Sequence, residues 1–212
     1  TQLNALSTTQ LASLTTTILN QLAATQWTGL RGAQLSALSS ATMASLSSVQ
    51  VGSLTTVQIA DLSSTALGNI SSSALAGMST QLIAALTTLQ IASLSTADFQ
   101  VLTTSQIAAL ETRDVAVLTG TNLAAMSSVQ LQALTSAQIA GLTSSQIAGL
   151  SSSRLQLLTS SQISAIEASD LAVLNSSQLL SLSADQLKSL NASQIAGLTS
   201  TQILSLTSSI LQ

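Results

Sequence analysis

Large apolar residues return at fixed positions every eight residues along the chain. From Leu134 to Leu150 the sequence reads LTSAQIAGLTSSQIAGL, one eight-residue phrase repeated with a single change. One apolar column runs from Leu3 to Leu211, and a second runs from Leu6 to Leu206. The register never slips over 212 residues. Each eight-residue unit, here called an octad, must therefore adopt an equivalent local structure.

A single continuous helix cannot use this period. Eight residues at about 100° each rotate the apolar stripe by about 80° per octad, so no single partner could cover the stripe. A flat strand fails because the two apolar columns are three positions apart and would lie on opposite faces. A helix that stops and restarts in each octad fits the pattern. A β-solenoid with a bend in each octad remains the alternative.

The polar columns favour the interrupted helix. The position after the second apolar column is Ser, Thr or Asn in every octad except at Ala23, Arg31, Glu111 and Glu167. Three residues later the column is Gln, Asp or Asn in most octads. This spacing is that of the capping box, in which the first of these columns is the N-cap residue and the second is N3, the third residue of the helix. The N-cap hydroxyl accepts the backbone N–H of N3, and the N3 side chain accepts the backbone N–H of the N-cap residue. Its repetition in one phase predicts an all-α fold with one two-turn helix per octad.

Acidic residues also lie where helix N-termini are predicted, as the helix macrodipole favours. Only Asp61 lies elsewhere; the others are Asp98, Asp114 and Asp170 at N3, Asp185 at N2, and Glu111 and Glu167 at the N-cap. The pairs Glu111–Asp114 and Glu167–Asp170 are seven octads apart, which raises the question of a calcium site. No Asp/Gly-rich calcium loop accompanies them. We therefore interpret these pairs as helix caps.

No octad can fold alone. Its two large apolar side chains contribute roughly 3–6 kcal/mol when buried, whereas ordering eight backbone units costs on the order of 8–16 kcal/mol. The helices must therefore stack as a solenoid, and the Ala, Gly and Ser columns allow close approach. We expect two helices per coil, with three as the open alternative. Trp27 and Phe99 occupy apolar columns and are expected to serve the core.

Composition limits the chemistry that the chain can perform. Charged residues make up 5% of the sequence, and His, Cys and Tyr are absent. Common metal ligands, general bases and soft nucleophiles are therefore missing, and we expect no catalytic, cofactor-binding or metal-binding residues. With four Lys plus Arg and a net charge of −3, we expect no binding to nucleic acid. Every octad interrupts its apolar residues with Ser, Thr or Gln, so we expect no membrane insertion.

The octad LTSSQIAG resembles the Leu-Thr-x-x-Gln-Ile-x-Ala octapeptide arrays of very large secreted or surface proteins of bacteria, often described as adhesins. The similarity extends over the whole chain, although copies such as ALGNISSSALAGM, from Ala66 to Met78, lack the Gln. The resemblance implies an extracellular stalk or fibre. It carries over no catalytic residues.

The sequence thus predicts one continuous solenoid over residues 1–212 without capping repeats. The first octads, TQLNALSTTQLASL, and the last, TQILSLTSSILQ, keep the internal pattern, where a terminal repeat would need a polar outer face. We therefore expect either a slice of a longer array or a secreted structural protein whose copies associate end to end and side by side. The alternative is a module that presents regular Ser and Thr rows to ice or to a polysaccharide.

Overall fold

The computed structural model describes the backbone of residues 2–210 and the side chains of residues 3–206. The chain divides into two units, Thr1–Leu110 and Glu111–Gln212. Every regular element among residues 2–210 is a helix. The predicted all-α fold is therefore confirmed, and the β-solenoid alternative is wrong.

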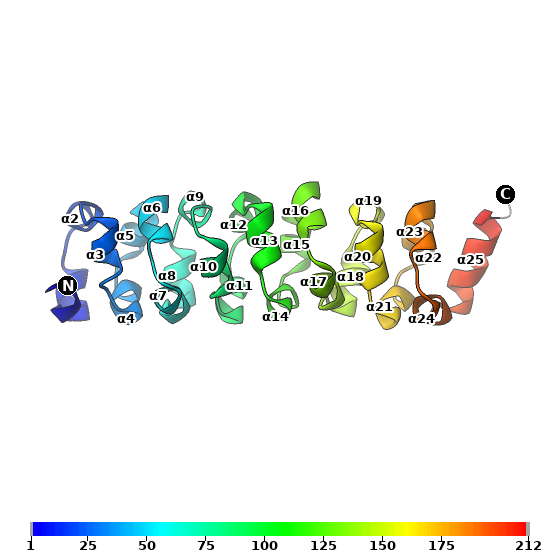
Figure 1. Cartoon of the computed structure of the whole chain (residues 1–212), viewed down its shortest axis with the longest axis horizontal. Coiled ribbons are helices and arrows are strands. Elements are labelled where there is room, and N and C mark those ends of the chain that lie inside the picture. Colours follow the sequence, from blue (N-terminus) through cyan, green and yellow to red (C-terminus); the bar gives the residue numbers. More distant parts are fainter. Residues whose placement is uncertain (1, 211–212) are drawn as a thin grey trace. The chain divides into compact units, whose positions relative to one another are not determined.

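Unit 1 is a succession of short helices, about one per octad, coloured blue to green in Figure 1. They are η1 (Gln2–Ala5), α1 (Thr8–Ala12), α2 (Thr16–Asn20), α3 (Ala24–Trp27), α4 (Gly32–Ser36), α5 (Ser40–Ser45), α6 (Ser48–Gly52), α7 (Thr56–Asp61), α8 (Ser64–Gly68), α9 (Ser72–Leu75), α10 (Thr80–Ala84), α11 (Thr88–Ser93), α12 (Thr96–Val101) and α13 (Thr104–Ala109).

Unit 2 repeats the same design, from green to red in Figure 1. Its helices are α14 (Thr112–Val115), α15 (Gly120–Ala125), α16 (Ser128–Ala133), α17 (Ser136–Ala140), α18 (Ser144–Gly149), α19 (Ser152–Leu157), α20 (Ser160–Ala165), α21 (Ala168–Ala172), α22 (Ser176–Leu180), α23 (Ala184–Lys188), α24 (Ala192–Ala196) and α25 (Ser200–Ile210).

The predicted capping box begins most of these helices, and α13 illustrates it. Thr103 is extended, with φ −71° and ψ 160°. The Thr103 hydroxyl accepts the N–H of Gln106 at 3.2 Å, and Gln106 Oε1 accepts the N–H of Thr103 at 2.7 Å. The helix ends at Leu110, which is again extended and whose N–H donates to the carbonyl of Ile107. The prediction that Leu ends one helix and Ser or Thr caps the next is confirmed.

The helices are shorter than predicted. From α1 to α24 each has four to six residues, so each makes between about 1.1 and about 1.7 turns instead of two. The reason is that backbone with extended angles separates successive helices. The N-cap residue is extended, as Thr103 is before α13, and in many octads so is the Leu that follows the helix, as Leu110 is after α13. Helix α25 differs, because its 11 residues continue through Thr207 without the predicted bend.

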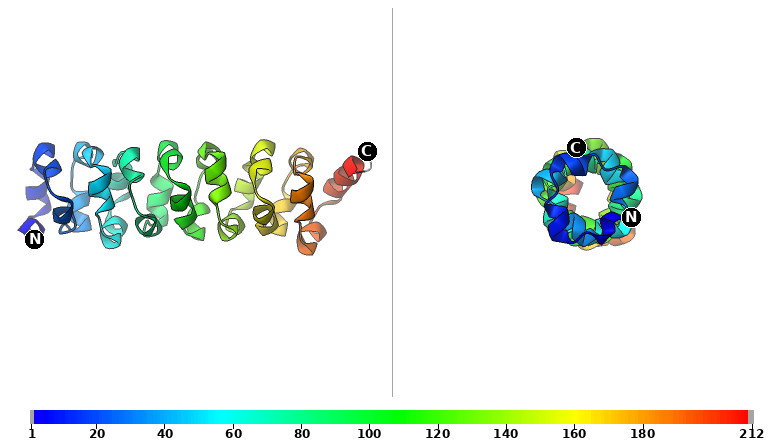
Figure 2. Two further views of the ribbon diagram at one scale, coloured as in Figure 1. Left: turned by 45° about the horizontal axis from the view of Figure 1, so that its top comes forward. Right: turned by 90° about the vertical axis from the view of Figure 1, so that its left-hand side faces the viewer.

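Within each unit the helices wind as a coil, and the predicted two helices per coil is wrong. Most helices pack chiefly on helices three places away along the chain, as α4 does on α7 and α22 on α25. Hydrogen bonds between successive coil turns join residues 28 positions apart, which is three and a half octads. Such a coil needs a change of direction of about 100° at each bend, whereas two helices per coil would need about 180°. The left view of Figure 2 shows this winding in the blue-to-green part of unit 1.

The two apolar columns form the core inside the coil, as predicted. Away from the first and last coil turns, the first column is almost entirely inaccessible; Ile59, Ile107 and Ile147 are each 0% exposed. The two large aromatic residues, Trp27 and Phe99, are also 0% exposed, which confirms their assignment to the core. No helix among the described residues combines the length and hydrophobicity needed to cross a bilayer.

Small residues bring successive coil turns into close contact, also as predicted. An ideal Cβ on Gly77 would lie only 2.5 Å from Cβ of Ser48, 29 residues earlier. A Cβ on Gly141 would overlap Cγ2 of Thr112, again 29 residues earlier. The glycine in each pair therefore makes room for the partner side chain on the neighbouring coil turn.

Candidate functional site

The Gln at N3 does more than cap its own helix, and Gln90 in α11 shows how. Its Oε1 accepts the backbone N–H of Thr87 at 2.7 Å, which is one half of the capping box. Its Nε2 donates to the backbone carbonyls of Ile59 and Leu62, both at 2.7 Å. These carbonyls lie at the C-terminal end of α7, on the preceding coil turn. One amide group therefore joins the N-terminus of one helix to the C-terminus of another.

This arrangement, here called the glutamine clip, recurs in both units. In each clip the side-chain Nε2 donates to the carbonyl 28 residues earlier, at 2.5–2.8 Å. Every one of these Gln side chains is buried. The clips are made by Gln34, Gln58, Gln90 and Gln106 in unit 1, and by Gln146, Gln162, Gln178, Gln186, Gln194 and Gln202 in unit 2.

A Gln side chain fits this position because its amide carries both an acceptor oxygen and two N–H donors. The last carbonyls of a helix have no partner within that helix, and a buried polar group without a partner costs about 1–3 kcal/mol. The clip satisfies these carbonyls from the next coil turn. Sequence analysis identified only the capping half of this role. The available signal was that the N3 column contains no Glu, which could cap but could not donate.

Asp98 and Asp170, which replace Gln at N3, link the coil turns in the opposite direction, because each carboxylate accepts a Ser hydroxyl from the preceding coil turn and donates to no helix-end carbonyl. Asp98 Oδ2 accepts the N–H of Ser95 at 2.8 Å, as a capping box requires. Its Oδ1 accepts the hydroxyl of Ser72, 26 residues earlier, at 2.7 Å. Asp170 and Ser144 form the same pair in unit 2. The predicted N3 positions of these carboxylates are therefore confirmed, and each links two coil turns.

Arg154 also links two coil turns from position N3, in a third way. It occupies N3 of α19, where its side chain cannot accept the N-cap N–H. Its guanidinium donates to the carbonyl of Leu123, 31 residues earlier, at 2.6 Å, and also to that of Ala124. The link between coil turns is thus kept, although half of the capping box is lost. Donation to the preceding helix end is the feature shared by Gln and Arg at N3.

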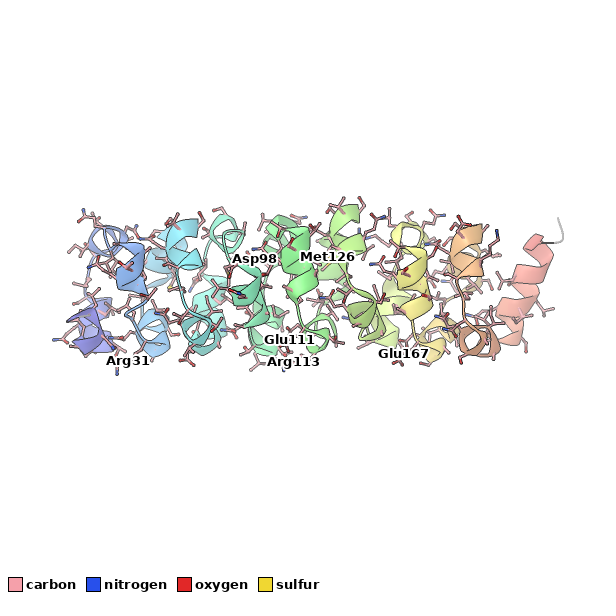
Figure 3. All side chains as sticks on the ribbon, viewed as in Figure 1. Arg31, Asp98, Glu111, Arg113, Met126 and Glu167 are labelled. Carbon is pink, nitrogen blue, oxygen red and sulfur yellow. The ribbon has the colours of Figure 1, made fainter. Side chains whose placement is uncertain are left out.

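In the acidic pairs the two Glu residues do not cap as interpreted from the sequence, whereas Asp114 does. Glu111 and Glu167 occupy N-cap positions, but neither side chain accepts a hydrogen bond from its helix. Glu is one methylene longer than the Asp that suits this position. The Glu111 carboxylate pairs instead with Arg113 at 2.6 Å, and both exposed side chains are labelled in Figure 3. Asp114 accepts the N–H of Glu111 at 3.1 Å. No group of three or more His, Cys, Asp or Glu that could hold a metal ion occurs among the described residues.

A surface hollow of about 360 Å³ beside α4 and α7 contains the charged residues Arg31 and Asp61. Gln58, which also lines it, is already engaged by its clip to Leu30. The guanidinium of Arg31, labelled in Figure 3, donates to Gln34 Oε1 at 3.4 Å. The side chains that line this hollow include no nucleophile held beside a general base.

Two of the three Ser/Thr rows, at the N-cap and N2 positions, do not present a regular outer array of hydroxyls. The N-cap hydroxyls accept backbone N–H groups, as that of Thr103 does. The exposed N2 positions include Val49, Val57, Leu89 and Val129, which are 60–78% exposed and interrupt the polar residues of that column. An array for ice or a polysaccharide would need the same group at each step. No specific observation favours that alternative.

Comparison with known proteins supports a repeat array. Residues 83–112, 107–144 and 163–200 match the model of the ALTTAQ repeat. A search of curated proteins found no match to the chain. The chain is therefore a tandem-repeat protein that is similar to the ALTTAQ repeat over these stretches.

Proposed function

We propose that this protein is a structural spacer, a repeat array whose length is its function. The observation that carries the proposal is the glutamine clip, which joins coil turn to coil turn in both units. Each octad contacts neighbouring coil turns, so stability comes from stacking and octads can be added without a new design. The side chains that carry polar chemistry are used for this stacking, which agrees with a non-enzymatic protein.

The proposed place of this spacer is an extracellular filament, surface fibre or adhesin stalk, in which copies associate end to end. The octapeptide resemblance to secreted bacterial arrays motivates the location. The low charge of the chain, 5% of its residues, motivates the association, because little repulsion keeps copies apart. The same low charge gives no basic surface for nucleic acid.

Deletion of whole octads tests the spacer function. Removal of residues 143–198, seven octads within unit 2, joins Leu142 to Thr199 in phase. The variant should fold with the helical circular dichroism of the parent, and small-angle X-ray scattering should give a shorter maximum dimension. A matched deletion of residues 143–194 breaks the phase by half an octad and should lose helical signal. An in-phase variant that unfolds, or that keeps the parent's maximum dimension, would contradict the proposal.

Antibody labelling tests the location. Antibodies against the purified chain should label intact cells of the source organism as strongly as permeabilised cells. A cytoplasmic protein labelled in parallel provides the control for membrane integrity. Labelling that appears only after permeabilisation would place the protein inside the cell and exclude a surface fibre.

A further inference from the structure

We propose that unit 1 opens first at one internal joint, where two neighbouring coil turns separate while the rest of the coil stays intact. This joint, here called the unclipped joint, lies between helices α4–α7 on one coil turn and helices α8–α10 on the next, all labelled in Figure 1. The inference goes beyond the spacer function proposed above and does not rest on it. It follows from the hydrogen bonds that join coil turns within unit 1.

Three successive octads at this joint lack a clip donor. Position N3 is Ala66 in α8, Ala74 in α9 and Leu82 in α10, and all three side chains are buried. An aliphatic side chain can neither donate nor accept a hydrogen bond. No other two neighbouring octads of the sequence both carry an aliphatic residue at this position. Because a coil turn takes three and a half octads, the clips are missing over most of one coil turn.

The helix ends opposite these side chains have no replacement partner. The clip acceptors 28 residues earlier are the carbonyls of Leu38, Leu46 and Leu54, and no side chain among the described residues donates to them. The single hydrogen bond that crosses this joint among the described residues runs from the N–H of Ser63 to Ser36 Oγ, at 3.0 Å. All three Leu residues are buried. A buried carbonyl without a partner destabilises the closed joint, because water would pair with it once the joint opens.

The joints on either side are bonded in the ways described above. In the following joint Gln90 and Gln106 form clips, and the Ser72 hydroxyl donates to Asp98. In the preceding joint Gln58 forms a clip. The unclipped joint therefore lies inside the coil, between bonded coil turns. Because the stability of a solenoid is close to a sum of nearest-neighbour contacts, the joint with fewer bonds than its neighbours should separate first.

Close contacts without hydrogen bonds hold the unclipped joint together. A Cβ on Gly52 would lie 2.9 Å from the carbonyl oxygen of Gly77, so the two coil turns meet backbone to backbone here. A surface hollow of about 380 Å³ lies beside this contact, and Ser48 and Val49 line it together with both glycines. Water therefore reaches the edge of the joint. A spacer under tension would lengthen at this joint first.

Restoring clips tests the inference. Ala66→Gln and Leu82→Gln together place an acceptor and a donor at N3 of α8 and α10, opposite the carbonyls that lack partners. The matched control, Ala41→Gln with Leu89→Gln, makes the same two changes at exposed side chains. Circular dichroism verifies that both double variants keep the helical signal of the parent.

A single thiol reports the opening of the joint in both double variants. The chain has no Cys, so Ala74→Cys places one thiol in the joint, at a residue that is 2% exposed. The rate at which this thiol reacts with an aromatic disulfide reagent should be at least tenfold lower in the clip-restored variant than in the matched control. Equal rates, or a higher rate in the clip-restored variant, would overturn the inference.

Hydrogen exchange of the unaltered chain tests the joint without any substitution. Short helices are unstable without stacked neighbours, so opening of the joint should expose their backbone N–H groups. In dilute urea, mass spectrometry should show at least tenfold faster exchange in peptides from residues 63–86 than in peptides from residues 155–190 of unit 2. There Gln162, Gln178 and Gln186 form clips. Equal exchange would rule out early opening at this joint, and the in-phase deletion would still test the spacer function separately.

Discussion

The side-chain amide of Gln162 donates to the backbone carbonyl of Leu134, 28 residues earlier, at 2.7 Å. A second bond reaches the carbonyl of Leu131 at 3.0 Å, and Gln162 is buried. These bonds connect octads that are three and a half units apart. They therefore fix which helix lies on which, in addition to stabilising the contact.

Replacement of this amide should weaken unit 2. Gln162→Met keeps a side chain of similar length but removes both donors and the cap acceptor, which leaves buried carbonyls unpaired. We expect a loss of about 2–4 kcal/mol in the free energy of unfolding, measured by urea denaturation. Gln156→Met, on the exposed surface of α19, should change it by less than about 0.5 kcal/mol. Equal effects of the two changes would show that the clip contributes nothing specific.

The inner apolar column should be sensitive to size and intolerant of charge. Ile147 is 0% exposed. Ile147→Ala should cost about 2–4 kcal/mol through lost burial and a residual cavity, and Ile147→Asp should cost more because an unpaired carboxylate would enter the core. Ser145→Asp, exposed in the first turn of the same helix, should be nearly neutral or slightly stabilising. Thermal unfolding followed by circular dichroism measures all three. A stable Ile147→Asp variant would mean that the column faces solvent.

Two glycines in almost identical octads should respond oppositely to Ala. A Cβ on Gly141 would overlap Cγ2 of Thr112, whereas a Cβ on Gly149 would meet nothing within 4 Å. Gly149→Ala should stabilise the chain by about 0.4–1 kcal/mol, because Ala reduces the entropy of the unfolded state. Gly141→Ala should destabilise it by about 1–3 kcal/mol through overpacking. The midpoint of urea unfolding measures both variants. If both midpoints shift in the same direction relative to the parent, the packing described here is wrong.

The indole of Trp27 should be replaceable by a phenyl ring. Trp27 is 0% exposed, and its Nε1 has no hydrogen-bond partner. Trp27→Phe removes this unsatisfied donor, which offsets the volume that is lost, so the free energy of unfolding should change by no more than about 1 kcal/mol. Trp27→Ala should cost about 3–5 kcal/mol. A loss of several kcal/mol in Trp27→Phe, measured by circular dichroism in urea, would reveal a partner for the indole N–H.

The local features of the fold were predictable because short-range bonds determine them. The Thr103 hydroxyl and the Gln106 amide make the capping box from residues three positions apart, so spacing alone identifies it. The core column that contains both Trp27 and Ile147 was equally clear from its period. Glu111 shows the limit of this reasoning, since a correct N-cap position did not make its longer side chain a cap.

The sequence by itself determined the octad, the helix starts and the inner columns of this protein. Only the tertiary structure decided how many helices complete a coil turn. That number depends on the bend angle at each extended N-cap residue, because small differences in this angle accumulate over successive bends. The donor half of the glutamine clip was hidden for the same reason. Gln90 donates to the carbonyls of Ile59 and Leu62, which lie 31 and 28 residues earlier in the chain. These separations follow from the geometry of the coil and not from the eight-residue period.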